Sequence, residues 1–112
     1  MTVYDTLFDL SSQYGEAFPW YILPPDQSYY VDELRKEMDT RHPLLQKTIR
    51  AIAKCQANDD VLFVCGDSGQ QPSYVIVHLT WQTNNTAGFP HYESFANVDS
   101  LREWLEKDMD LG

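Results

Sequence analysis

Three histidines and two cysteines are the residues of this chain that could bind a metal ion or take part in nucleophilic catalysis. His42, His78 and His91 are far apart in the sequence, and neither Cys55 nor Cys65 has a His or Cys neighbour at the short spacing of a zinc site. We therefore expect no metal and no cofactor. Both cysteines are interpreted as small buried apolar residues, Cys55 in a helix and Cys65 in a strand. His78 lies among apolar residues and is expected to be a hydrogen-bonded core residue.

A short loop contains the other candidate for catalysis. Residues 66–69 read Gly-Asp-Ser-Gly, the tetrapeptide around the nucleophile of trypsin-like serine proteases. That chemistry also needs a His base and a buried Asp from a much longer chain, and the only earlier histidine directly precedes Pro43. Residues 66–72 are dense in turn formers, which favours a loop. No glycine-rich phosphate-binding motif is present, and the sequence predicts a protein that is not an enzyme.

The first 38 residues predict two helices separated by an extended segment. Apolar residues recur every three or four positions over 3–14, and Gly15 can end that helix. Three closely spaced prolines then exclude a regular helix and favour an aromatic segment with an edge strand at 20–23. A second helix is expected over 28–38, with Ser28 as its N-cap.

A third and stronger helix is predicted over residues 43–56. Leu45, Ile49, Ile52 and Gln56 follow one another at spacings of four, three and four, which is the period of one apolar helical face.

The second half of the chain predicts a meander of strands and a closing helix. Residues 61–65 are almost all apolar, and 73–81 has two apolar faces, so both are expected to be buried strands, the second one central. A third strand is expected within 90–95. The closing helix is expected over 98–109, with Asp99 as a plausible cap.

Length and composition predict one α+β domain over residues 1–112: N-terminal helices, a small antiparallel meander from about 61 to 95, and a C-terminal helix. Apolar residues make up 43% of the chain, which is enough for a core. The sequence has no apolar run of about 18 residues that would span a membrane. It begins without the basic and apolar segments of a secretion signal, so we expect a cytoplasmic protein.

Charge is distributed unevenly along the chain. The formal net charge is −9, yet residues 35–54 carry a net +4 and the remainder a net −13. An acidic protein of this kind is unsuited to general nucleic-acid binding, which requires cations. Plain solubility is one explanation of the charge. Recognition of a cationic protein partner is the other.

Aromatic residues are numerous, with three Trp, seven Tyr and five Phe. We expect Phe8, Phe63 and Trp104 in the core, whereas Trp20 and Tyr21 stand beside prolines where cores seldom reach. Such residues either fill gaps in a small irregular fold or anchor an interface. The candidate partner-binding residues combine acids with aromatic rings: Asp59, Asp60, Asp67, Trp81, His91, Tyr92 and Glu93.

The C-terminal half resembles small bacterial immunity proteins, the cytoplasmic partners of polymorphic and contact-dependent inhibition toxins. The resemblance covers roughly residues 60–108. It rests on the strand 73–81 ending in His-Leu-Thr-Trp, a polar loop, Phe89-Pro90, an aromatic segment to Phe95, and the closing helix. It implies a non-enzymatic protein that binds and neutralises a cognate toxin domain, often a nuclease. The cationic cleft of a nuclease suits an acidic ligand.

Two other functions remain open. The chain is alternatively a general interaction or adaptor domain, including a homodimer joined through the edge strand at 20–23. A small enzyme is the third reading, which a well-formed pocket around a perturbed His78 or His91 would support.

Overall fold

The structure, a computed structural model, describes residues 3–24, 29–37, 48–66, 73–79 and 92–111. Their helices and strands follow in this order: α1 (Val3–Tyr14), the short 3-10 helix η1 (Gly15–Ala17), β1 (Trp20–Ile22), α2 (Tyr29–Glu37), β2 (Thr48–Cys55), β3 (Asp60–Gly66), β4 (Ser73–His78), β5 (Tyr92–Phe95) and α3 (Val98–Leu111).

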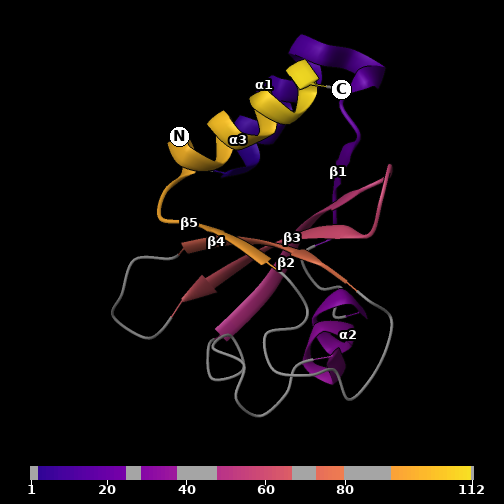
Figure 1. The fold of residues 1–112 in the computed structure, drawn as a ribbon, viewed down its shortest axis with the longest axis vertical. Coiled ribbons are helices and arrows are strands. Elements are labelled where there is room, and N and C mark those ends of the chain that lie inside the picture. The colour runs from indigo at the N-terminus through magenta and orange to yellow at the C-terminus, as the bar shows by residue number, and fades with distance from the viewer. Residues whose placement is uncertain (1–2, 25–28, 38–47, 67–72, 80–91, 112) are drawn as a thin grey trace.

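The five strands form one antiparallel sheet in the order in which they occur along the chain. The predicted α+β fold is confirmed, and the meander begins earlier than expected because β1 and β2 precede β3. Figure 1 shows α1 and α3 side by side on one face of the sheet and α2 on the other face. No described helix has the length and apolar character that crossing a membrane requires.

Apolar side chains fill both spaces between the sheet and the helices. On the side of α1 and α3, Leu7, Leu10, Leu101 and Leu105 pack with sheet residues such as Leu62. On the side of α2, Leu34 packs with the opposite sheet face, whose buried members are Ile49, Ala51, Val61, Phe63, Cys65, Val75 and Val77. The alternation of side chains along β3 and β4 thus supplies both cores at once.

The predicted helix over 43–56 is wrong for the residues that the structure describes, because Thr48–Cys55 is strand β2. The register with β3 shifts between Ala51 and Ala53, so Ile52 is an extra residue in a β-bulge. Ile49 and Ala51 therefore face α2, whereas Ile52, Ala53 and Cys55 face α1 and α3. The bulge breaks the period of two, and the remaining apolar spacing imitates a helix. Residues 43–47 lie outside the described residues.

Both cysteines are buried, and neither forms a disulfide. Cys55 lies in β2, and its predicted helical position is corrected with the helix. Cys65 lies in β3, as predicted, and faces the opposite core.

The ends of the helices follow from local chemistry. Gly15 directly follows α1 and has φ +61°, a backbone conformation that favours glycine. At the start of α3 the cap is Asn97 and not Asp99, since the N–H of Ser100 donates to Asn97 Oδ1 at 2.8 Å. The predicted cap Ser28 lies outside the described residues.

Two aromatic assignments are reversed by the structure. Phe8 was expected in the core but is 63% exposed, whereas Trp20 was expected outside it and is only 7% exposed. Trp20 lies on the face of β1 that α1 covers, whereas Phe8 lies on the side of α1 that is open to solvent. Phe63 is fully buried as predicted, and Trp104 is half-buried.

Candidate protein-binding site

A hydrogen bond joins the first residue of β3 to the last residue of β4. Asp60 and His78 are directly paired across the two strands, and His78 Nδ1 lies 2.9 Å from Asp60 Oδ1. Two bonds fix the neighbouring turn: the N–H of Asp60 donates to Asn58 Oδ1 at 2.9 Å, and the N–H of Leu79 donates to the carbonyl of Asp59 at 3.2 Å. Hydrogen bonds therefore fix the position of both strands at this corner of the sheet.

A shallow depression of about 130 Å³ opens beside this pair. The pairing of β4 with β5 sets Glu93 opposite Ile76 and Tyr92 opposite Val77, so the meander brings β5 to the same place. Trp104 of α3 lies at its edge, with its ring 5.9 Å from that of Phe95 in an edge-on arrangement. The lining residues come from β3, β4, β5 and α3: Asp60, Ile76, His78, Tyr92, Glu93 and Trp104.

The depression is acidic and partly aromatic. The described residues of its lining include two carboxylates and no Lys or Arg, and the exposed Asp59 is adjacent in sequence to Asp60. Carboxylates around Tyr and Trp rings suit a cationic protein surface, because the rings supply buried area and the carboxylates supply charge complementarity.

His78 and Asp60 could exchange a proton with a ligand, but the other described residues of the lining supply no Ser, Cys, Thr or Lys nucleophile. Within the described part of the chain, no group of three or more His, Cys, Asp or Glu residues is arranged to hold a metal ion.

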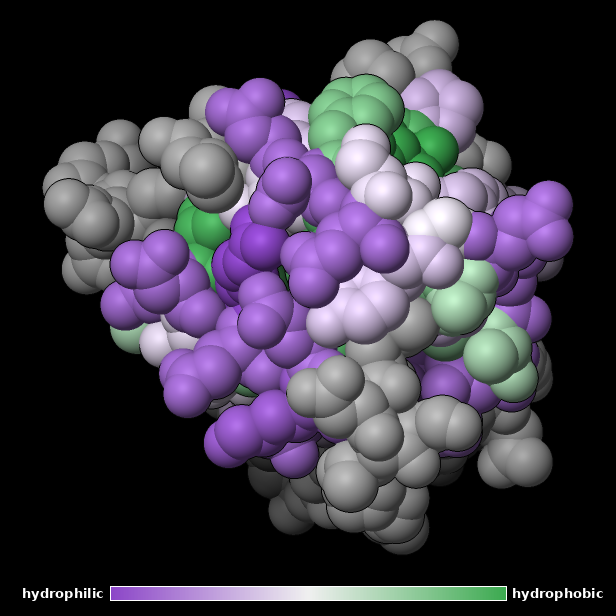
Figure 2. All heavy atoms as spheres, turned by 90° about the horizontal axis from the view of Figure 1, so that it is seen from above, coloured by the Kyte–Doolittle hydropathy of each residue, from purple (hydrophilic) through white to green (hydrophobic). Residues whose placement is uncertain are grey.

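The one Arg on α3 is neutralised by its neighbours. Arg102 Nη2 lies 2.6 Å from Asp9 Oδ2 of α1, and Arg102 Nε donates to Glu106 Oε1 at 2.6 Å. These bonds, that to Asp9 first, raise the pKa of Arg102 above its ordinary value. Figure 2 shows the face that carries α1 and α3, where hydrophilic residues gather across the centre and apolar ones are visible toward the rim.

The structure brings together three of the predicted site residues, Asp60, Tyr92 and Glu93, and places Asp59 in the turn beside them. The other predicted members, Asp67, Trp81 and His91, lie outside the described residues.

Sequence reasoning missed two members of the site. The side chain of His78 is 59% exposed, so its predicted core position is wrong, although the predicted hydrogen bond is present. Trp104 was assigned to the core, and it is half-buried at the edge of the depression. One signal was available for His78: in an antiparallel hairpin between strands 61–65 and 73–81, the residue before the first strand meets a residue near the end of the second.

Comparison of the chain with protein-family models, with curated proteins and with solved structures finds no match.

Proposed function

We propose that this chain is a non-enzymatic immunity protein that binds and neutralises a cognate toxin domain, with a nuclease as the expected toxin. One observation carries the proposal: acidic and aromatic side chains from two strands and one helix meet at a single depression around Asp60, Tyr92, Glu93 and Trp104. The proposal includes a cytoplasmic location, in which thiols such as those of Cys55 and Cys65 stay reduced.

The physical basis is charge complementarity. A nuclease holds phosphates in a cationic cleft, so two neighbouring carboxylates offer it a matching surface. Opposite charge accelerates encounter and selects the partner, and desolvated aromatic rings provide much of the affinity. The partner is therefore a protein and not a nucleic acid.

The test starts from the gene directly upstream of this one, which the proposal expects to encode a large secreted protein, and uses the C-terminal domain of that protein. We expect a one-to-one complex in which the toxic activity is lost. Its association rate, measured by stopped flow, should fall as salt is raised. Reversal of both carboxylates, Asp60→Lys with Glu93→Lys, should slow association at low salt by about tenfold or more.

A control with the same change of charge is Asp32→Lys with Glu16→Lys, at two exposed positions on α2 and η1 that do not line the depression. We expect this variant to change the rate by less than about threefold. Equal slowing by the control would show a general charge effect and would contradict this site. The absence of any complex, or a toxin that stays active within it, would contradict the proposed function.

The second candidate is a general interaction or adaptor domain, and the outer edge of β1, with which no described strand pairs, favours it. Sedimentation of the isolated protein separates the two functions. A stable dimer that ignores the upstream toxin domain would favour the second.

A further inference from the structure

A titratable side chain lies between the two carboxylates of the acidic depression. Strand β4 lies between β3 and β5, and His78 at its end is directly opposite Asp60 of β3. Glu93 of β5 is opposite Ile76, so it is the diagonal neighbour of His78 on the same face of the sheet, within reach of a long side chain. The exposed Asp59 precedes Asp60 in the turn. The imidazole therefore has a carboxylate on the strand at each side.

The bond to Asp60 decides which nitrogen of His78 takes up a proton. A carboxylate only accepts hydrogen bonds, so the neutral imidazole carries its hydrogen on Nδ1, which lies 2.9 Å from Asp60 Oδ1. Nε2 is then the atom that gains a proton. The side chain is 59% exposed, so water can supply that proton. The resulting imidazolium retains the bond to Asp60 and adds one positive charge to the lining of the depression.

The other charged groups near the depression are held by other contacts or lie outside its lining. Lys54 Nζ donates to the carbonyls of Cys55 and Asn58 at 2.6 Å each, which fixes this cation at the turn after β2. Arg102 of α3 is neutralised by its own acidic partners and does not line the depression. Tyr92 does line it, but tyrosine side chains titrate far above neutral pH. Among the described lining residues, the imidazole is therefore the group whose type changes charge between about pH 5 and 8.

This positive charge would oppose a cationic partner. When the imidazole is neutral, both carboxylates of the lining face the partner with their full charge. When the imidazole is protonated, one of the two negative charges is offset at the position where the partner docks. A like charge that faces a cationic group in a contact without water is costly. Protonation of His78 and binding of the partner therefore disfavour each other.

We propose that protonation of His78 regulates the capture of the cationic partner at this depression. The neutral imidazole leaves both carboxylates available, whereas the imidazolium, which histidines form as the pH falls from about 8 toward 5, weakens binding. By linkage, the arriving partner releases the proton from Nε2 to the solvent. This inference rests on the proposed function, because it concerns the same site and the same partner.

The test measures the affinity for the C-terminal domain of the protein encoded upstream, by calorimetry at about pH 7.5 and about pH 5.5. His78→Asn is the matched variant, because its amide can donate to Asp60 from nearly the position of Nδ1 but takes up no proton. Between the two pH values, we expect wild type to lose about tenfold more affinity than His78→Asn. Titration of the partner cancels in this comparison, since both proteins meet the same partner. The lower pH stays above about 4, near which aspartate and glutamate generally titrate.

A second measurement follows the proton itself. Binding enthalpies near pH 6 in buffers of different ionisation enthalpy give the number of protons released on binding. Wild type should release more protons than His78→Asn, by up to about one per complex. A role of His78 in structure alone would lower the affinity of His78→Asn equally at both pH values and would leave the proton release unchanged.

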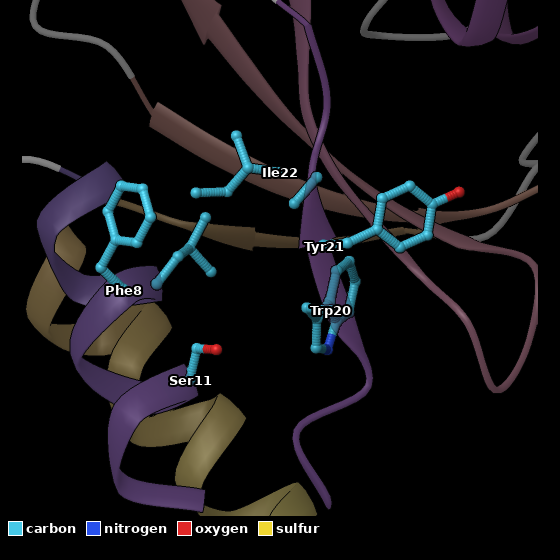
Figure 3. Close-up of a pocket in the computed structure, with 7 residues that line it drawn as sticks. Phe8, Ser11, Trp20, Tyr21 and Ile22 are labelled. Atoms are coloured by element: carbon cyan, nitrogen blue, oxygen red, sulfur yellow. The ribbon is translucent and has the colours of Figure 1, made fainter. Parts of the chain in front are cut away.

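A fixed charge imitates the imidazolium. His78→Lys should bind about tenfold more weakly than wild type at about pH 7.5, with less dependence on pH. Its control is Ser11→Lys, which adds the same charge at an exposed position in the apolar groove between α1 and β1. Figure 3 shows Ser11 projecting from α1 toward β1, the strand farthest from β5 in the sheet. We expect this control to lower the affinity less than threefold, a rough limit for a charge outside the contact.

Any of three results would overturn the inference while the proposed function stands. They are a neutralising complex whose affinity depends on pH equally in wild type and His78→Asn, equal proton release by these two proteins, and equal losses in His78→Lys and Ser11→Lys. A complex that tightens in wild type alone as the pH falls would show that the imidazolium meets an acidic group of the partner, and it would also overturn the inference. The absence of a complex at both pH values would contradict the proposed function and the inference together.

Discussion

His78 Nδ1 and Asp60 Oδ1 lie 2.9 Å apart and close the β3–β4 pair at the end where β3 begins. The carboxylate side chain is 19% exposed and the imidazole 59% exposed, so the bond is partly open to water. It holds Asp60 beside the depression, and the strand pairing brings Glu93 to the same place through Ile76. The orientation of one proposed partner-binding carboxylate thus depends on a histidine that sequence patterns assign to the core.

Replacement of the Asp60 carboxylate tests how much its bond to His78 contributes to stability. Asp60→Asn removes one negative charge and weakens the bond to His78, and we expect a loss of about 0.5 kcal/mol in the free energy of unfolding, typical of a partly exposed pair. The neighbouring Asp59→Asn removes the same charge at an exposed position and should change stability by less. Urea unfolding measures both. An equal loss in the two variants would mean that the His78 contact contributes nothing.

The link between the two helices on one face of the sheet gives a second prediction. Arg102→Gln removes the contacts with Asp9 and Glu106, and we expect a loss of about 0.5–1 kcal/mol at low salt that shrinks as salt is raised. Lys107→Gln on the same helix removes the same charge at an exposed position and serves as the control. Denaturant midpoints at two salt concentrations measure the effect. A salt-independent loss in Arg102→Gln would point to packing of its stem and not to its charge.

The acidic pair on α2 predicts a dependence of stability on pH. The pKa of Glu33 is raised above its ordinary value, first by a hydrogen bond with Glu37, then by burial and the charge of Glu37. The folded protein therefore holds the carboxyl proton of Glu33 more tightly than the unfolded chain does. The stabilisation by protonated Glu33 is fully present below about pH 4.5 and is lost as pH rises through the pKa of Glu33 in the folded protein.

Glu33→Gln removes this titration and retains a hydrogen-bond donor for the fully buried Glu37. The variant should gain stability relative to wild type as pH rises from 4 toward 7, measured as the difference between their denaturant midpoints. Asp32→Asn, one position earlier on the helix, controls for net charge. If the difference in midpoint between Glu33→Gln and wild type stays constant over this range, or reverses, the raised pKa of Glu33 is contradicted.

Two phenylalanines, one buried and one exposed, test which positions belong to the hydrophobic core. Phe63 is fully buried, so Phe63→Ala should cost about 3–5 kcal/mol through lost burial and a cavity. Phe8 is 63% exposed, so Phe8→Ala should cost less than about 1 kcal/mol. Thermal or urea unfolding of the two variants measures the contrast. A large cost at Phe8 would mean that its ring is buried in the folded protein.

Much of the fold could be predicted from local signals. The helix at Val3–Tyr14 has one apolar stripe and a glycine after it, and the segment around Trp20–Ile22 is too rich in prolines for a helix. Strand β2 could not be read in this way. It contributes buried residues to both faces of the sheet and a bulge interrupts its alternation at Ile52, so its period carries no clear strand signal.

The site could be predicted only in part. The residue types of Asp60, Tyr92 and Glu93 near strand ends indicate a binding surface, and antiparallel pairing brings them together. The contribution of Trp104 depends on how α3 packs beside β5, which no local pattern records. Phe8 illustrates the same limit. Helical periodicity places it beside the apolar stripe, but only the position of α1 against β1 decides that it stays exposed.

The extra residue at Ile52 has a consequence for how the protein unfolds. The first half of β2 packs against the layer of α2, and its second half packs against the layer of α1 and α3. One strand therefore contributes to both hydrophobic cores. Neither helical layer can detach without exposing part of the same strand. We therefore expect melting in a single step, with the near-ultraviolet signals of aromatic groups on the two sides vanishing together.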